Sequence, residues 1–119
     1  GAREVDAVEI DATVHGAIRA NADRNGVGER LRVSAVLPMR DAGYDLVVAN
    51  ITAGVLMEHA AALCAAVRRG PAGRRAGGIV LSGLRGDEAD RVAGRYCDFL
   101  GTAPRGVALG DWHCLRFGS

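Results

Sequence analysis

This sequence of 119 residues has few aromatic residues and few cysteines, and neither positive nor negative charge is in excess. Phe, Trp and Tyr make up 4% of the chain, so the core must be built from Val, Leu, Ile and Ala. The formal net charge of +1 gives no general reason to expect binding to nucleic acid or to an anionic membrane. No apolar run approaches the ~20 residues that a transmembrane helix needs. The composition therefore predicts one globular domain over residues 1–119, with no membrane span.

The three cysteines, Cys64, Cys97 and Cys114, are odd in number and far apart in the sequence. This pattern favours reduced thiols in a cytoplasmic protein over a disulfide framework, because buried free cysteines commonly act as small hydrophobes. The histidines show no metal-ligand spacing with these cysteines, so no metal is expected. The first residues, G-A-R-E-V-D, lack a basic and then apolar leader, which also favours the cytoplasm.

Hydrophobic periodicity predicts strands that alternate with helices. Strands are expected at residues 4–9, 31–35, 45–50 and 79–82, and strand-like segments at 105–109 and 112–117. Helices are expected from Asp11 to about Asn25, from about Thr52 to Arg69, and from a cap at Asp87, with Ala89, Val92, Ala93, Tyr96 and Phe99 facing inward. Alternating strands and helices predict an α/β fold with a mostly parallel sheet covered on both faces. Gly110-Asp111 predicts an antiparallel hairpin at the C-terminal end.

Polar side chains stand where the predicted strands end, and ligands bind beyond the carboxyl ends of strands in an open parallel sheet. The first strand ends in Glu9, the second near Ser34, the third in Asn50 and the fourth in Ser82-Gly83. A carboxylate can accept two hydrogen bonds from a ribose diol, which makes Glu9 a candidate for nucleotide binding. The alternative is that Glu9 is only a solvated strand end.

The amide of Asn50 also has two interpretations. It offers two donors and one acceptor, so it can bind the ammonium and carboxylate of a cofactor or orient an incoming amine. The alternative is an asparagine that caps the helix following it.

The stretch V-V-A-N-I-T-A-G-V-L, residues 47–56, resembles V-V-A-N-I-L-A-G-P-L of the bacterial ribosomal-protein methyltransferase family. Members of that family methylate amino groups of protein eleven of the large ribosomal subunit. Four other segments resemble family motifs in the same order: A-V-E-I-D at 7–11, N-A-D-R-N-G-V at 21–27, G-G-I-V-L-S-G-L at 77–84 and D-W-H-C-L at 111–115. The resemblance implies a Rossmann-like class I fold, a three-layer sandwich, that uses S-adenosylmethionine.

The resemblance also implies roles for individual residues. Glu9 would hold the ribose of S-adenosylmethionine, Ile10 would lie against the adenine, and Ser34 would stand at the adenine edge. Asn50 would contact the amino-acid end of the cofactor beside the substrate amine, and is the expected catalytic residue. Trp112 either lines the substrate side or belongs to the core or the sheet edge. The expected partner is a protein substrate, a ribosomal protein, methylated on a lysine side chain or an N-terminal amine.

The glycine-rich G-x-G-x-G turn of the family has no counterpart here. G-V-G-E-R at 26–30 follows a helix instead of a strand, and the glycines at 70–78 precede a strand. The resemblance therefore implies that the first, central strand and the substrate-recognition domain lie outside this chain, and that residues 36–44 cross the central position. We expect the C-terminal part of a catalytic domain, or half of a split enzyme, complemented by an N-terminal segment or chain.

Two other functions stay open at this point. A non-catalytic methyltransferase-like fragment would only bind a partner chain. A nucleotide- or NAD-binding module would share the strand-end acid, but it would need a glycine-rich turn. The arginines at positions 68, 69, 74 and 75 either keep their loop solvated or contact ribosomal RNA.

Overall fold

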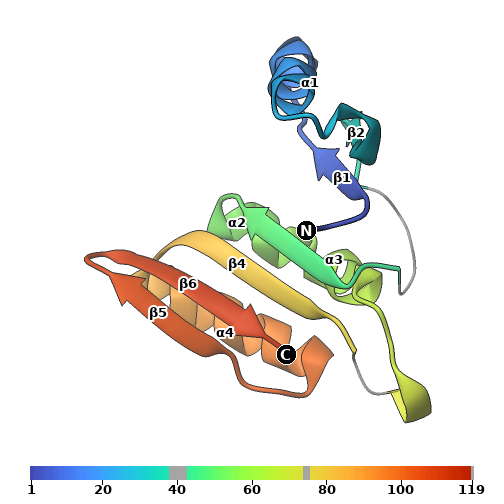
Figure 1. The fold of residues 1–119 in the computed structure, drawn as a ribbon. Helices are drawn as coiled ribbons and strands as arrows, with labels where there is room; N and C mark the ends of the chain where they lie inside the picture. Colours follow the sequence, from blue (N-terminus) through green and yellow to red (C-terminus); the bar gives the residue numbers. More distant parts are fainter. Residues whose placement is uncertain (38–42, 74–75, 119) are drawn as a thin grey trace. The chain divides into compact units, whose positions relative to one another are not determined.

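The computed structural model describes residues 1–37, 43–73 and 76–118. The chain forms two compact units, Gly1–Met39 and Arg40–Ser119, which Figure 1 colours along the sequence. Residues 38–42, which belong to the segment 36–44 predicted to cross the central position, lie outside the described residues, as do Arg74 and Arg75.

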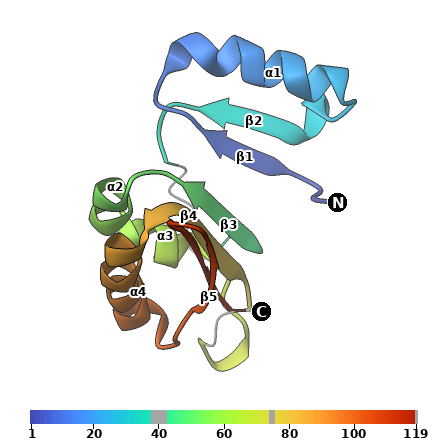
Figure 2. The same ribbon diagram turned by 90° about the vertical axis from the view of Figure 1, so that its left-hand side faces the viewer.

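The first unit is a parallel strand pair with one helix. Strand β1, Val5–Val8, pairs in parallel with β2, Leu31–Ser34. Between them the chain forms a 3-10 turn at Ala12–Val14, the helix α1 at His15–Arg24 and a second 3-10 turn at Gly28–Arg30. Figure 2 shows α1 running alongside the two strands. The predicted strand–helix–strand order is confirmed.

The start of the first helical segment follows the predicted capping. Asp11 accepts a hydrogen bond from the backbone N–H of Thr13 at 3.0 Å, as an N-cap residue should. Val14, Ile18, Asn21 and Ala22 fall on one face of the helix predicted from Asp11, but only Ala22 of the four is buried, and Val14 is 39% exposed. Val14 belongs to the 3-10 turn, so it does not share the face that a 3.6-residue period defines on α1.

The second unit holds a sheet of four strands in the order β3-β4-β6-β5. Strand β3, Leu46–Asn50, is parallel to β4, Gly78–Arg85. Strand β6, Trp112–Phe117, is antiparallel to both β4 and β5, Arg105–Leu109. The predicted C-terminal hairpin is confirmed, and β4 is central because it pairs on both sides.

Strand β4 is longer than the predicted segment 79–82. Its parallel pairing with β3 stops at Ser82, but its antiparallel pairing with β6 continues to Arg85. A register shift between Leu81 and Leu84 marks a β-bulge, and Ser82 and Gly83 lie inside it. The prediction that this strand ends in Ser82-Gly83 is therefore wrong, because the two residues bend the strand without ending it.

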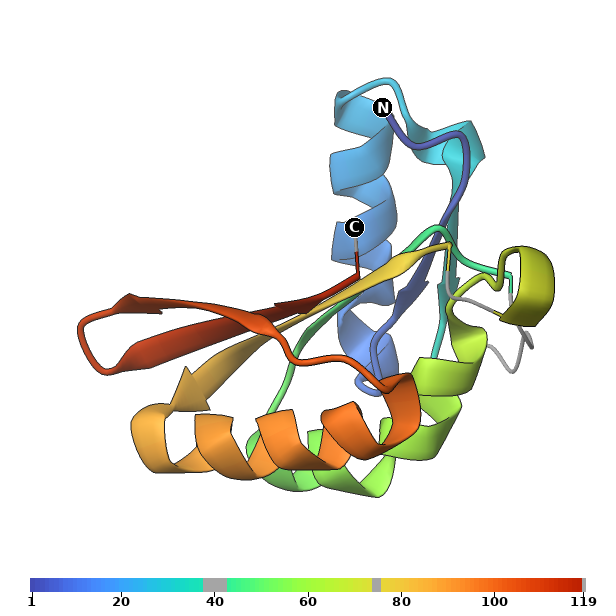
Figure 3. The same cartoon turned by 90° about the horizontal axis from the view of Figure 1, so that it is seen from below.

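Three helices lie on one side of this sheet, as Figure 3 shows: α2, Ala53–Glu58, α3, Ala60–Ala66, and α4, Gly86–Leu100. The single helix predicted from about Thr52 to Arg69 is wrong in two respects. It is interrupted at His59, whose φ of −95° and ψ of 9° depart from helical values, and it ends at Ala66.

The chain after α3 is extended and pairs with the residues that precede β3. Val67 forms a parallel bridge with Tyr44, and the N–H of Arg68 donates to the carbonyl of Tyr44 at 2.7 Å. This pairing replaces the helical hydrogen bonds, which explains the early end of α3. Arg68 also pairs with Asp45 at 2.6 Å, so it has a partner within the protein.

Helix α4 begins one residue before the predicted cap at Asp87. Its N-cap is Arg85, whose N–H donates to the carboxylate of Glu88 at 3.0 Å, one half of a capping box. Phe99, predicted to face inward, is 36% exposed. The guanidinium of Arg95 lies 4.8 Å from the centre of its ring, a cation–π contact that suits an exposed aromatic side chain.

The hydrophobic core lies between this sheet and its helices. Burying one large aliphatic side chain contributes about 1.5–3 kcal/mol to stability. The large side chains that are almost fully buried are Leu56, Cys64, Val67, Ile79, Leu81, Leu84, Val92, Tyr96 and Phe117.

The opposite face of the sheet is open among the described residues of this unit. Leu46 is 56% exposed and Val48 is 64% exposed, whereas Ala49 is buried. Alternation along β3 directs Val47 and Ala49 to the helices and the other side chains away from them. Within this unit the helices therefore cover one face of the sheet, and Leu46 and Val48 are not buried by it.

One hydrogen bond inside the core allows a direct test. The hydroxyl of Tyr96 donates to the carbonyl of Leu56 at 2.9 Å, and Leu56 lies in the last turn of α2, where carbonyls lack helical partners. Replacing Tyr96 with phenylalanine should lower the free energy of unfolding by about 1–3 kcal/mol, because a buried carbonyl loses its donor. Denaturant unfolding measures the change; equal stability of the two proteins would show that the bond contributes nothing.

Candidate functional site

The end of β1 holds Glu9 in a defined position. Its N–H donates to the carbonyl of Ser34 at 3.0 Å, which extends the pairing with β2 by one residue. Its own carbonyl lies 2.6 Å from Nε2 of His15, and a carbonyl only accepts, so the imidazole donates. One carboxylate oxygen accepts the N–H of Asp11 at 2.9 Å. A carboxylate has about four acceptor positions, so capacity for a ligand diol remains.

The neighbouring acid, Asp11, has a structural role. The carboxylate of Asp11 accepts hydrogen bonds from the hydroxyl of Thr13 at 2.6 Å and from its N–H at 3.0 Å. The hydroxyl bond, then the backbone bond, lower the pKa of Asp11 below its ordinary value. Asp11 thus caps the helical turn, and Glu9 is the acid with free capacity.

Ile10 and Ser34 lie at the same end of the strand pair. The side chain of Ile10 is 85% exposed. The hydroxyl of Ser34 donates to the carbonyl of Val36 and accepts from its N–H, each at 3.1 Å, so it closes a turn after β2. Because β1 and β2 are parallel, their carboxyl ends bring Glu9, Ile10 and Ser34 together, as the sequence predicted for one sheet edge.

Asn50 is the last residue of β3 and lies opposite Ser82 of β4. Its side chain is exposed, and none of the described residues forms a hydrogen bond with its amide. The N-cap of α2 is Thr52, and no side chain caps that helix by a hydrogen bond. The helix-cap interpretation of Asn50 is therefore wrong, and the amide is available to a ligand.

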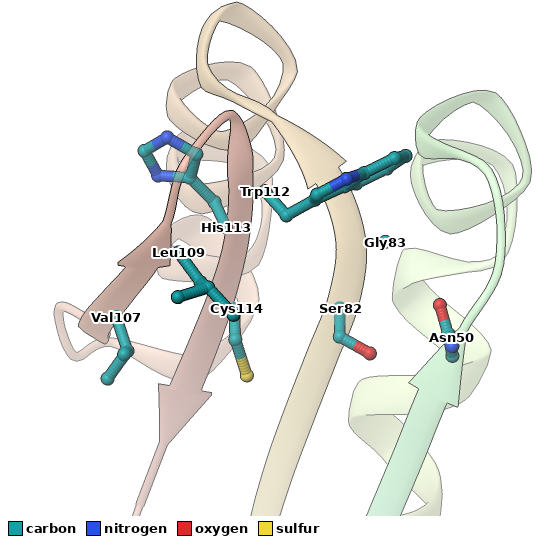
Figure 4. Close-up of a pocket in the computed structure, with 8 residues that line it drawn as sticks. All are labelled: Asn50, Ser82, Gly83, Val107, Leu109, Trp112, His113 and Cys114. Atoms are coloured by element: carbon teal, nitrogen blue, oxygen red, sulfur yellow. The ribbon is translucent and has the colours of Figure 1, made fainter.

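The amide of Asn50 faces an open cavity of about 420 Å³ (Figure 4). In this view the indole of Trp112 extends from β6 across the end of β4. The cavity is lined by Asn50, Ser82, Gly83, Val107, Leu109, Trp112, His113 and Cys114. Among these described lining residues there is no Asp, Glu, Lys or Arg.

Most of the lining comes from the open sheet face. Val107 pairs with Cys114 and Leu109 with Trp112, and paired residues direct their side chains to the same face. Trp112 is 59% exposed. Trp112 lines this cavity, so its predicted place in the core is wrong, and its position on the substrate side stays a prediction.

Several lining residues were not singled out from the sequence for this site. The signal for Val107 and Leu109 is their alternation with small residues in a hairpin strand, which marks one apolar face. Gly83 carries the signal of a Ser-Gly pair, but such a pair equally suggests a strand end. Nothing in the sequence marks Cys114 as a lining residue except its position two residues after Trp112.

The predicted cofactor residues therefore fall in two groups. Glu9, Ile10 and Ser34 belong to the unit Gly1–Met39, and Asn50 belongs to the unit Arg40–Ser119. That Glu9 and Asn50 act on one ligand stays a prediction.

Two findings concern other kinds of site. Within residues 1–37, 43–73 and 76–118, no three side chains of His, Cys, Asp or Glu are grouped as metal ligands would be. None of the described helices combines the length and the hydropathy needed to cross a membrane.

The sequence is similar to curated ribosomal protein L11 methyltransferases. It is 41% identical over 115 residues to the ribosomal protein L11 methyltransferase of Alkalilimnicola ehrlichii, covering 97% of this chain and 37% of that protein. It is 44% identical over 96 residues to the ribosomal protein L11 methyltransferase of Methylococcus capsulatus, covering 81% of this chain and 31% of that one. The chain thus spans only about a third of the length of these relatives.

Solved structures show the same fold at lower sequence identity. A ribosomal protein L11 methylase from Lactobacillus delbrueckii subsp. bulgaricus superimposes with a TM-score of 0.79 at 21% identity, over 98% of this chain and 57% of that chain. A methyltransferase from Pyrococcus furiosus gives 0.71 at 20% identity, over 96% and 61%. The predicted class I methyltransferase fold, α/β with a mixed sheet, is confirmed. The family model of ribosomal protein L11 methyltransferases, PrmA, matches residues 1–119, and the chain belongs to that family.

Proposed function

We propose that this chain forms the cofactor-holding part of an S-adenosylmethionine-dependent methyltransferase that acts on amino groups of a ribosomal protein. The observation that carries the proposal is the free amide of Asn50 at the end of β3, facing a cavity with no charged carboxylate or ammonium among its described lining residues. Family membership supports the reaction class, because the relatives are named ribosomal protein L11 methyltransferases.

The donor set of this chain fits S-adenosylmethionine. Glu9 has acceptor capacity for the two ribose hydroxyls after its bond to the N–H of Asp11. The exposed side chain of Ile10 offers an apolar surface for the adenine, and Ser34 stands at the next strand end. Asn50 offers both donors and an acceptor to the ammonium and carboxylate of the methionine part. When bound, S-adenosylmethionine supplies a methyl group on a positively charged sulfur.

We also assign to Asn50 the role of orienting the target amine. An amine attacks only through its unprotonated lone pair, and it must be held in line with the methyl group. A neutral amide orients the N–H groups without the charge that would favour the ammonium form. Because the described lining contains no carboxylate, the amine loses no reactivity to an ion pair there.

Trp112 forms the apolar wall on the substrate side of this site. An indole face attracts a cation within about 6 Å, and it can pack against the methylene groups of a lysine side chain. With 59% of its surface exposed, Trp112 has room for such a contact. A protein side chain or N-terminus is therefore the acceptor class that the cavity suits.

We further propose that a polypeptide segment outside these residues completes the sheet. Among the described strands, β1 pairs only with β2, and β3 pairs only with β4. Each therefore has an open edge with unpaired backbone groups, which another strand can use. An N-terminal segment or chain with the glycine-rich turn would supply the strand and the contacts to the cofactor that these residues lack.

A reconstitution experiment tests the proposed function. Four samples are titrated with S-adenosylhomocysteine by calorimetry: residues 1–119, a complementing N-terminal segment, the two combined, and the intact polypeptide. The same samples are assayed for transfer of labelled methyl to ribosomal protein L11. Binding and transfer are expected only in the combined sample and in the intact polypeptide.

Other outcomes of this experiment contradict specific parts of the proposal. Tight binding by residues 1–119 alone would refute the need for a further strand. Association of the two parts without cofactor binding would favour a non-catalytic fragment that binds a partner chain.

A further inference from the structure

The β-bulge in β4 holds a glycine, Gly83, at a position where a side chain would meet Asn50. Gly83 has a φ of +80°, in the left-handed region that favours glycine, and it lines the same cavity as Asn50. A Cβ atom at Gly83 would stand 2.5 Å from Oδ1 of Asn50, well inside van der Waals contact. Figure 4 shows the two residues on neighbouring strands.

We infer that Gly83 is a positioning residue for Asn50, an inference that rests on the proposed function of this amide. No hydrogen bond from the described residues fixes the amide in one orientation. The space left by the missing Cβ therefore decides which orientations the amide can adopt. Gly83 keeps open the orientation in which the Asn50 amide lies beside the bulge of β4 and faces the cavity.

A side chain at position 83 should change the orientation of the Asn50 amide more than the stability of the fold. Oδ1 is the end of a rotatable side chain, so a Cβ at position 83 turns the amide away at little cost to the backbone. The remaining cost is that of placing alanine at a positive φ, which any glycine of this kind shares. Gly101 provides the matched control, because its φ is +67° and a Cβ there would meet nothing within 4 Å.

The test compares four variants of the complete native polypeptide: G83A, G101A, N50A and the double variant N50A/G83A. Three quantities are measured: the melting temperature, the Kd of S-adenosylhomocysteine, and kcat and KM for methyl transfer. G83A and G101A should lower the melting temperature by similar amounts. Of these two glycine variants, only G83A should raise the Kd and lower kcat, each by about 10-fold, as expected for a misplaced polar group.

The double variant shows whether Gly83 acts by positioning Asn50 or has its own effect on binding and transfer. If Gly83 acts through Asn50, then N50A/G83A should bind and turn over no worse than N50A alone. The side-chain amide resonance of Asn50, identified by its loss in N50A, should move in G83A and stay in place in G101A. Unchanged Kd and kcat in G83A, an unmoved resonance, or losses that add fully in the double variant would each overturn the inference.

The proposed function fails in a different way. If N50A itself leaves Kd and kcat unchanged, Asn50 has no role in binding or transfer, whatever Gly83 does. If N50A is strongly impaired and G83A is not, the proposed function stands and the inference about Gly83 is wrong.

Discussion

Replacing Asn50 with alanine should lower kcat for methyl transfer by about 100-fold, because the variant no longer orients the amine toward the methyl group. The side chain of Asn50 is exposed and makes no hydrogen bond with the described residues, so its loss should leave the melting temperature nearly unchanged. Steady-state kinetics with ribosomal protein L11, together with thermal unfolding, measures both effects. A variant with normal kcat would remove the catalytic role of this amide.

Two companion variants sharpen that prediction. Asn50→Asp keeps the size of the side chain but adds a negative charge beside the amine, which favours the ammonium form. It should therefore be impaired at neutral pH and recover partly as pH rises and the amine loses its proton. Asn21→Ala is the matched control, since Asn21 is an exposed asparagine on α1 whose side-chain oxygen accepts a hydrogen bond from Arg24.

Replacing Glu9 with glutamine should raise the Kd of S-adenosylmethionine by about 10- to 100-fold, because charged hydrogen bonds contribute about 1.5–3 kcal/mol. The glutamine amide can still accept the N–H of Asp11, so the end of β1 should keep its local structure. Calorimetric titration of the complete polypeptide measures the change.

The control for Glu9 is another acid on the same unit. Glu4 pairs with Arg32 at 3.2 Å, with both side chains more than half exposed, and Glu4→Gln should leave the Kd unchanged. Equal Kd values for Glu9→Gln and the unchanged protein would contradict the ribose-binding role. A conservative Glu9→Asp variant should recover much of the affinity, because it restores the charge with a shorter reach.

The sequence is informative wherever a local signal decides the structure. Gly110-Asp111 predicts the hairpin, and Asp11 predicts the helical start, because turns and caps depend on a few neighbouring residues. The end of β3 at Asn50 is also predicted, since the apolar run stops there. Glu9, Ser34 and Asn50 stand at strand ends of this kind, so the sequence places them correctly, and their roles toward the cofactor stay predictions.

Predictions from the sequence are wrong where contacts between residues far apart in the sequence determine the structure. The apolar stripe through Leu56 and Leu63 continues to Val67, but pairing with Tyr44 makes that last residue extended. The run Leu46–Ala49 has the composition of a buried strand, yet burial on both sides requires elements on both faces of the sheet. The bulge at Gly83 depends on how β6 pairs with β4, which a Ser-Gly pair cannot reveal.

The uneven burial of the two units has a consequence for cofactor recognition. Among the described residues of Gly1–Met39, only Ala22 is a buried apolar residue, whereas the other unit holds the rest of the core. A segment with so little buried surface opens locally at a small free-energy cost. In the proposed function, a ligand bound by Glu9 also has to order this segment. The dissociation constant of residues 1–119 alone should therefore be weaker than the contacts by themselves would give.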